Sequence, residues 1–139
     1  MSLPDLRVKA KQAWQEVLDP QKTQIFIGMA TCGEASGALA INNAIDFTLT
    51  KNKINAKVHR AGCLGMCYAE PMIDIIKPGQ PRITYRNLNT ETASELIEDY
   101  LINDNPRPDL ALGIWGEEKF GIPDLFQLGF LKNQVRIAI

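Results

Sequence analysis

The stretch GCLGMCYAEP, residues 62–71, places two cysteines, two glycines and a proline between two short apolar runs. Cys63 and Cys67 are four positions apart, and the two glycines allow the backbone to fold back so that both sulfurs can face one point. We therefore interpret this stretch as a loop that holds thiols. Cys32 is the third and last cysteine of the chain, and the fold decides whether it meets the other two.

Cys32 lies in a second glycine-rich turn, GMATCG (residues 28–33), directly after a short apolar run. We predict a strand over residues 23–27, a helix from Glu34 up to Lys51 and a second strand over residues 56–61. Because a long helix separates the two strands, they should pair in parallel through a right-handed crossover. Both cysteine turns then follow the carboxyl ends of neighbouring strands, the edge at which open α/β sheets build their sites.

The flanking segments complete an α/β pattern. Residues 6–18 carry apolar positions at helical spacing and predict an amphipathic helix before the first strand. After Pro71, the apolar runs of residues 72–77 and 82–85 flank a turn rich in proline and glycine, which predicts a hairpin. Asn89 is suited to cap a last helix. The order of elements is therefore βαβ followed by ββα.

The end of the chain differs in character from the rest. Residues 103–109 (NDNPRPD) form a linker by composition, and no long periodic element follows them. We predict one domain over residues 1–102 and a linker with an aromatic-rich tail over residues 103–139. Large aromatic side chains need a surface that covers them, and we expect those of the tail to pack on the domain: Trp115, Phe120, Phe126 and Phe130.

Composition narrows the function classes. With 139 residues, 45% of them apolar and 22% charged, the chain can bury a core without cross-links. The net charge is −1 and the basic residues are scattered, so we expect neither a nucleic-acid partner nor membrane insertion. The N-terminus lacks the apolar core of a signal peptide, which predicts a cytoplasmic protein. Three cysteines in a reducing compartment leave metal binding, redox chemistry or inert burial as options.

The order of elements resembles the thioredoxin fold: a mixed four-stranded sheet with helices on both faces, here with an added N-terminal helix and an irregular tail. Pro71 stands where that fold has its cis-proline. More narrowly, residues 62–71 and the segment TCGEASGA (residues 31–38) resemble the thioredoxin-like 2Fe–2S ferredoxins. That family includes the small subunit of NADH dehydrogenase and the N-terminal domain of related flavoprotein subunits in NAD-linked dehydrogenases and hydrogenases. The resemblance covers roughly residues 23–102.

The resemblance implies an electron-transfer domain with a 2Fe–2S cluster held by Cys32, Cys63 and Cys67, and without a substrate site of its own. FMN and NAD are expected only in a following domain or in a partner flavoprotein. The tail, residues 126–139, resembles the segment that leads into the FMN- and NADH-binding domain of such flavoproteins. The chain is then expected to be part of an NADH dehydrogenase-like oxidoreductase.

The chain departs from the family in its first turn. The family holds its cluster with four thiolates, spaced Cys-x4-Cys in the first turn and Cys-x3-Cys in the second. Only the second pair is intact here, and alignment places Gly28 and Gly33 at the two ligand positions of the first turn. Cys32 is shifted from the second of these by one residue. His59 is the only histidine, and we interpret it as an ordinary strand residue.

Three interpretations of the cysteines stay open. In the first, they hold a 2Fe–2S cluster whose fourth ligand is water or an oxygen of Thr31, Ser36 or Glu34. In the second, the cluster has been lost and the domain is a docking or structural module of the same kind of complex. In the third, Cys32 forms a redox-active disulfide with Cys63 or Cys67, because its place near a helix N-terminus is expected to lower its thiol pKa.

Other chemistries fit less well. Structural zinc sites take four nitrogen or sulfur ligands, which three cysteines and one distant histidine do not supply. The spacing Gly28-x4-Gly33 imitates the start of a phosphate-binding loop, but Glu34 follows where a lysine is required. We interpret Tyr68 and Glu70 as loop and packing residues without a catalytic role.

Overall fold

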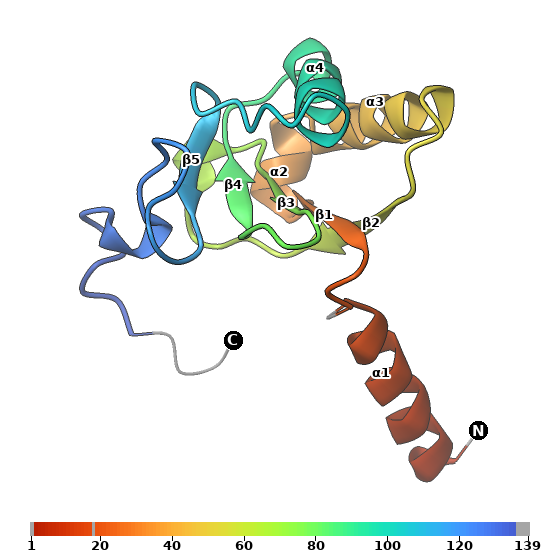
Figure 1. Ribbon diagram of the computed structural model, residues 1–139. Helices are drawn as coiled ribbons and strands as arrows, with labels where there is room; N and C mark the ends of the chain where they lie inside the picture. The colour runs from red at the N-terminus through yellow and green to blue at the C-terminus, as the bar shows by residue number, and fades with distance from the viewer. Residues whose placement is uncertain (1, 18, 136–139) are drawn as a thin grey trace.

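The structure, a computed structural model, describes residues 2–17 and 19–135 and is built around a mixed five-stranded sheet (Figure 1). The order across the sheet is β2-β1-β3-β4-β5, so that β2 is one edge. β1 pairs in parallel with β2, and the other neighbours pair antiparallel. The strands are β1 (Thr23–Gly28), β2 (Ala56–Ala61), β3 (Ile73–Ile76), β4 (Ile83–Tyr85) and β5 (Ala111–Ile114). The predicted order βαβ followed by ββα is confirmed, with β5 added.

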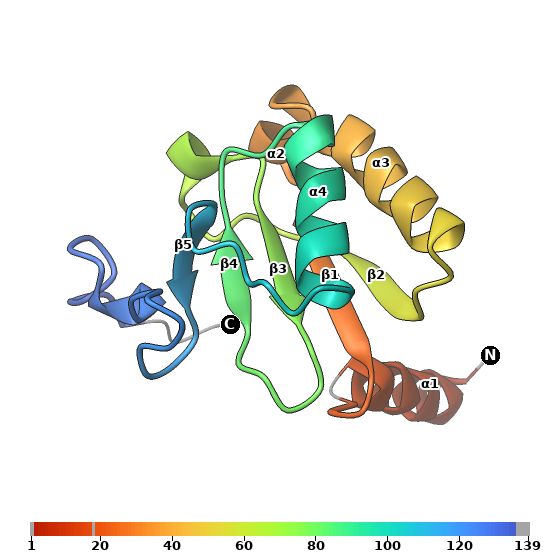
Figure 2. The same ribbon diagram turned by 45° about the horizontal axis from the view of Figure 1, so that its top comes forward.

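Two helices, α3 (Ala38–Lys51) and α4 (Thr90–Leu101), lie side by side over one face of the sheet (Figures 1 and 2). The helix predicted from Glu34 is divided in two, because Gly37 adopts a φ of 100° that ends the short helix α2 (Thr31–Ala35) before α3 begins. Asn89 caps α4 as predicted, accepting a hydrogen bond from the Thr92 backbone N–H.

The main core lies between the sheet and these two helices. Alternate positions of the central strands point toward the helices, because successive side chains of a strand face opposite sides. Each isoleucine buried there contributes about 1.5–3 kcal/mol relative to an exposed one. The fully or almost fully buried members include Ile25, Ile27, Ile41, Ile45, Ile73, Ile75, Ile83, Leu96 and Ile97.

The opposite face of the sheet is covered by the C-terminal segment and not by an α-helix. Trp115 donates a hydrogen bond from its indole Nε1 to Thr84 Oγ1, 2.9 Å away. The Arg82 guanidinium lies between two rings, 4.8 Å from the Phe26 centroid and 4.1 Å from the Trp115 centroid. A second apolar cluster joins this segment to the cysteine loop, and its buried members are Met66, Ala69, Met72, Leu112, Leu125 and Leu131.

The tail contributes more structure than its composition predicts. β5 pairs with β4, and a 3₁₀ helix, η2 (Leu125–Gln127), packs near it. Trp115 packs as expected, whereas the large aromatic side chains that follow it in the tail remain 38–50% exposed. The resemblance of the tail to a flavoprotein segment falls partly on residues 136–139, which lie outside the described residues.

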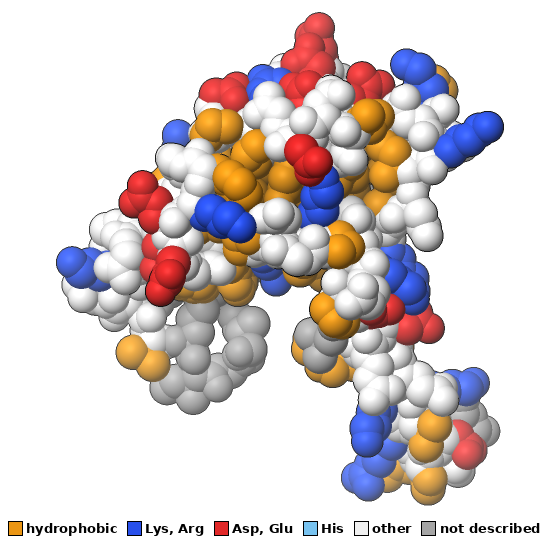
Figure 3. Space-filling view, in the orientation of Figure 1, with side chains coloured by type: hydrophobic (Ala, Val, Ile, Leu, Met, Phe, Trp, Pro, Cys, Tyr) orange, Lys and Arg blue, Asp and Glu red, His pale blue; other side chains and the backbone are white. Residues whose placement is uncertain are grey.

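Helix α1 (Leu3–Val17) extends away from the sheet and has no buried residue (Figure 1). Hydrophobic and basic side chains lie along this projecting helix (Figure 3). Its last turn touches the sheet edge: Glu16 forms an ion pair with Lys57, and its backbone carbonyl accepts a hydrogen bond from Gln24 Nε2. None of the helices in the described ranges is long and apolar enough to cross a membrane.

Candidate metal centre

The two cysteine loops meet because the two parallel strands before them are in register. Gly28 at the end of β1 is paired with Ala61 at the end of β2, so both loops leave the sheet side by side, at the carboxyl ends of the two strands. Cys32 lies in α2, and Cys67 begins the 3₁₀ helix η1 (Cys67–Ala69). The Sγ atoms of Cys32, Cys63 and Cys67 all lie within 4.8 Å of one another, and Cys63 and Cys67 are 3.7 Å apart. The prediction that the sulfurs share one edge of the sheet is confirmed.

The three thiols are chemically unequal. The Gly65 backbone N–H donates to Cys63 Sγ at 3.2 Å, and this hydrogen bond lowers the pKa of Cys63. Interactions with the Cys67 and Cys63 sulfurs raise the pKa of Cys32 to about 11. The expectation that the Cys32 pKa is lowered is therefore wrong, because the neighbouring sulfurs raise it.

Glu70 is the site residue that the sequence interpretation missed. Its side chain is only 7% exposed, and its Oε2 accepts a hydrogen bond from the Met72 backbone N–H at 2.9 Å. Its Oε1 lies 4.0 Å from Cys32 Sγ, which donates to it. Burial raises the pKa of this carboxyl. The Glu70–Pro71 peptide bond is cis, as the resemblance to the thioredoxin fold implied.

Two glycines leave the space that the Glu70 carboxylate occupies. A Cβ at Gly28 would lie 3.0 Å from both Glu70 oxygens. A Cβ at Gly33 would lie 2.2 Å from the Gly28 carbonyl oxygen and 3.4 Å from Glu70 Oε2. These are the two positions at which the resemblance places ligands, and in this backbone a side chain at position 33 would collide with the main chain. The pair of glycines was a signal in the sequence that a group from elsewhere fills this space.

Comparison with known proteins finds a relative by sequence. No family model matches the chain. It is 30% identical over 111 residues to the NADP-reducing hydrogenase subunit HndB of Solidesulfovibrio fructosivorans, an alignment that covers 76% of this chain and 85% of the relative. The chain belongs to the HndB family.

Solved structures similar to this HndB-family chain share its fold. A thioredoxin-like [2Fe–2S] ferredoxin from Aquifex aeolicus matches 69% of the chain and 94% of its own length, with a TM-score of 0.58 and 13% identity. A second structure, of the wild-type protein, matches 67% of the chain and 98% of its own length, with a TM-score of 0.56 and 14% identity. The predicted thioredoxin-like fold is confirmed.

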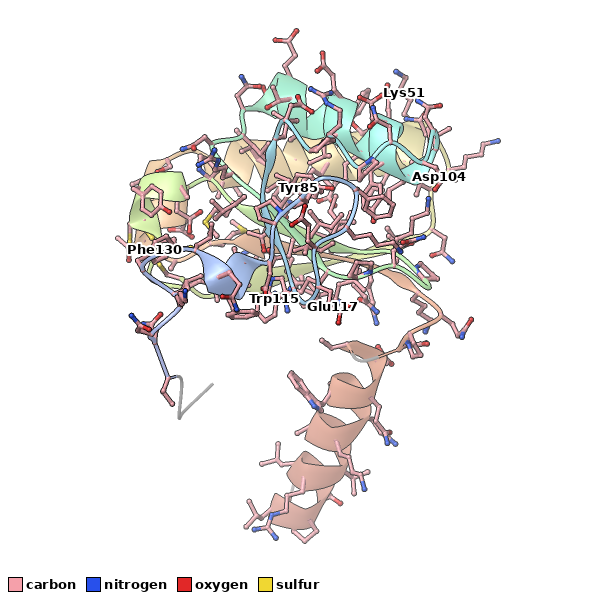
Figure 4. The ribbon with its side chains drawn as sticks, turned by 60° about the vertical axis from the view of Figure 1, so that its left-hand side comes forward. Lys51, Tyr85, Asp104, Trp115, Glu117 and Phe130 are labelled. Atoms are coloured by element: carbon pink, nitrogen blue, oxygen red, sulfur yellow. The ribbon has the colours of Figure 1, made fainter. Side chains whose placement is uncertain are left out.

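The shared fold implies a 2Fe–2S cluster, and the donor atoms of this HndB-family chain can be compared with the ligands that such a cluster needs. Such a cluster takes four protein ligands, most often thiolates. The chain has three cysteines, and all three converge at the edge of the sheet. Sulfur atoms gather at the end of the sheet where Phe130 lies (Figure 4). The cysteines therefore fit three of the four positions, and the fourth needs another donor.

No carboxylate or imidazole of the described residues joins the three sulfurs in one group. The group of convergent ligand atoms in the described part of the chain holds the three sulfurs, and Glu34, His59 and Glu70 all lie outside it, although Glu70 Oε1 is 4.0 Å from Cys32 Sγ. His59 is engaged elsewhere, with its Nε2 2.6 Å from Gln24 Oε1 and its ring stacked on Phe26 at 4.9 Å. The interpretation of His59 as a strand residue agrees with these contacts.

Proposed function

We propose that this chain is an electron-transfer subunit or domain of an NAD(P)-linked hydrogenase or dehydrogenase, with a 2Fe–2S cluster bound through Cys32, Cys63 and Cys67. The observation that carries the proposal is the convergence of the three sulfurs within 4.8 Å at the carboxyl edge of the sheet. It is supported by the family of the chain, whose relative is a hydrogenase subunit, and by a fold shared with [2Fe–2S] ferredoxins. When bound, the cluster supplies a one-electron redox centre.

The residues around the sulfurs suit this role. The Gly65 N–H that points at Cys63 Sγ stabilises negative charge on sulfur, and such donors raise the reduction potential of a thiolate-bound centre. Cys67 is exposed, so the centre would lie close to the molecular surface, where a partner can approach it. The partner in this proposal is a flavoprotein that carries FMN and NAD.

The chain is proposed to have two parts in this assembly. Residues 1–102 form the unit that holds the cysteines, and residues 103–139 form the linker and tail that lead toward the flavoprotein. The first part of this tail also pairs with the sheet through β5. The start of the tail is therefore held in a fixed position relative to the metal centre, which lies on the same sheet.

Anaerobic purification followed by iron and acid-labile sulfide analysis tests the proposal. We expect about two irons and two sulfides per chain, absorption bands between roughly 400 and 550 nm, and reversible bleaching on reduction. Cys63→Ser should remove or shift these bands. A chain that stays colourless and free of iron after reconstitution with Fe²⁺ and sulfide would contradict the proposal.

One observation favours a second candidate, a docking module without a cluster. Helix α1 leaves the body of the domain and buries none of its residues. Its large apolar side chains are therefore exposed, with Leu3 at 63% and Trp14 at 61%. An apolar stripe of this kind is typical of a helix that binds a partner. If the iron-free chain still bound the other subunits of the complex with unchanged affinity, this candidate would replace the first.

A further inference from the structure

The Glu70 carboxylate is the buried polar group to which the proposed function gives no role. Among the ion pairs of the described residues, none includes Glu70, and its Oε1 has only the Cys32 thiol as a hydrogen-bond partner there. A carboxylate that is only 7% exposed is costly to bury unless a cation or several donors compensate its charge. A metal ion beside the three sulfurs would supply that compensation.

The donor atoms of the site lie close together, and Cys32 Sγ is within 4.8 Å of both other sulfurs. Cys63 Sγ lies 3.7 Å from Cys67 Sγ, and Cys32 Sγ lies 4.0 Å from Glu70 Oε1. Metal–sulfur bonds of about 2.3 Å and metal–oxygen bonds of about 2.0–2.2 Å place two ligands of one tetrahedral ion about 3.5–3.8 Å apart. Each pair therefore has nearly the spacing of two ligands on one ion. A 2Fe–2S cluster takes two ligands on each of its two irons.

The surroundings of Glu70 hold its carboxylate in this place. The Met72 N–H binds Oε2, which leaves Oε1 directed toward Cys32, and such orienting hydrogen bonds are typical of metal ligands. Gly28 provides the room, because a Cβ there would lie 3.0 Å from both carboxylate oxygens, whereas a Cβ at Gly33 would clash with the Gly28 main chain. In the loop that carries Cys63 and Cys67, a Cβ at Gly62 or Gly65 would meet nothing within 4 Å, so these glycines leave no comparable space for a group from another segment.

Resting on the proposed function, we infer that Glu70 is the fourth ligand of the cluster, with its Oε1 on the same iron as Cys32 and with Cys63 and Cys67 on the other. The carboxylate thus takes the place of the thiolate that the first loop lacks. This assignment replaces Thr31, Ser36, Glu34 and water as candidates for the fourth ligand.

Reconstitution with Fe²⁺ and sulfide under anaerobic conditions tests the inference with two matched variants. Glu70→Gln keeps the shape of the side chain and an acceptor for the Met72 N–H but removes the anionic ligand. Glu34→Gln makes the same change on an exposed carboxylate of α2. We expect wild type and Glu34→Gln to take up about two irons and two sulfides. Glu70→Gln should lose iron to a chelator at least ten times faster and shift the absorption and EPR spectra.

A rescue variant supplies sulfur where the carboxylate lies. Because a Cβ at position 28 would be 3.0 Å from both Glu70 oxygens, Gly28→Cys combined with Glu70→Ala should place a thiolate in the vacated space. We expect this double variant to recover two irons and to release them more slowly than Glu70→Gln. The double variant also tests the inference if Glu70→Gln does not fold. A double variant that folds but does not hold iron would contradict the inference.

The outcomes separate the two proposals. If Glu70→Gln matches wild type in iron content, spectra and rate of iron loss, Glu70 is not a ligand, while the electron-transfer function stands. If wild type itself takes up no iron, the proposed function fails first. Binding of a single iron without sulfide would overturn the two-pair assignment.

Discussion

The loop after β1 and the loop after β2 serve one site under opposite constraints. The first loop holds one thiol and is fixed at Gly33, where the backbone of Gly28 leaves no room for a side chain. The second holds two thiols, its glycines face open space, and Met66 and Ala69 anchor it in an apolar cluster. The difference teaches that one loop is positioned by main-chain contact and the other by a few buried side chains.

The largest expected effect separates the glycines of the two loops. Gly33→Ala should lower the free energy of unfolding by about 3 kcal/mol, because its Cβ would lie 2.2 Å from the Gly28 carbonyl oxygen and the backbone must shift. Gly62→Ala, which meets nothing within 4 Å, should change it by less than about 0.5 kcal/mol. Urea unfolding of the metal-free chain measures both. Equal losses of unfolding free energy in the two variants would show that the two loops are not constrained differently.

The anchor of the second loop should give the next largest effect. Met66 is 2% exposed, and Met66→Ala should cost about 2 kcal/mol through lost burial and a cavity. The cost lies at the low end for such changes because the neighbouring loop can partly collapse into the space. The same unfolding experiment measures it, with Tyr68→Ala, 61% exposed, as a control in the same loop. A Met66→Ala variant as stable as wild type would show that this loop has no such anchor.

The thiols of the two loops should react at different rates in the metal-free chain. The pKa of Cys63 is lowered and that of Cys32 is raised to about 11, so near pH 8 a larger fraction of Cys63 is thiolate. This larger thiolate fraction speeds alkylation of Cys63. The more acidic thiolate is intrinsically less nucleophilic, which offsets part of the gain, so we expect Cys63 to react about tenfold faster than Cys32, equivalent to about 1.4 kcal/mol. Iodoacetamide labelling followed by peptide mass spectrometry measures the rates.

The pH dependence sharpens this prediction. The rate at Cys32 should keep rising until the pH passes about 11, whereas the rate at Cys63 should level off at a lower pH. Faster labelling of Cys32 at pH 8 would reverse the assignment of the two environments.

The smallest effect concerns the contact between the second loop and the tail. The Tyr68 and Phe130 rings meet edge to face with centroids 5.8 Å apart, and both side chains are at least half exposed. A double-mutant cycle with Tyr68→Ala and Phe130→Ala should give a coupling energy of about 0.5 kcal/mol. A coupling of zero would mean that the tail does not stabilise this loop.

Elements with a strong local pattern could be predicted from the sequence. β1, β2 and α4 form where periodicity and capping placed them, and the parallel pairing of β1 with β2 follows from the long helix between them. The convergence of the three sulfurs required no more than this topology. The sequence thus contained enough to locate the candidate site.

What could not be predicted depends on contacts between distant segments. The four residues of β5 are too few to show a period, and they form a strand only because β4 offers an edge. The role of Glu70 depends on space left by Gly28 and Gly33, which lie about forty residues earlier in the chain. Helix α1 had a clear amphipathic pattern, but the pattern does not say that its apolar face stays unburied.

The register between β1 and β2 limits how the length of the chain can vary over evolutionary time. Both loops start from paired residues, Gly28 and Ala61, so one residue inserted within either strand would displace its sulfur-bearing loop by about 3.3 Å and turn it toward the other face. At the far end of the same strands, the turn of residues 52–55 lies away from the sulfurs. Insertions and deletions should therefore accumulate in that turn and be purged from the two strands.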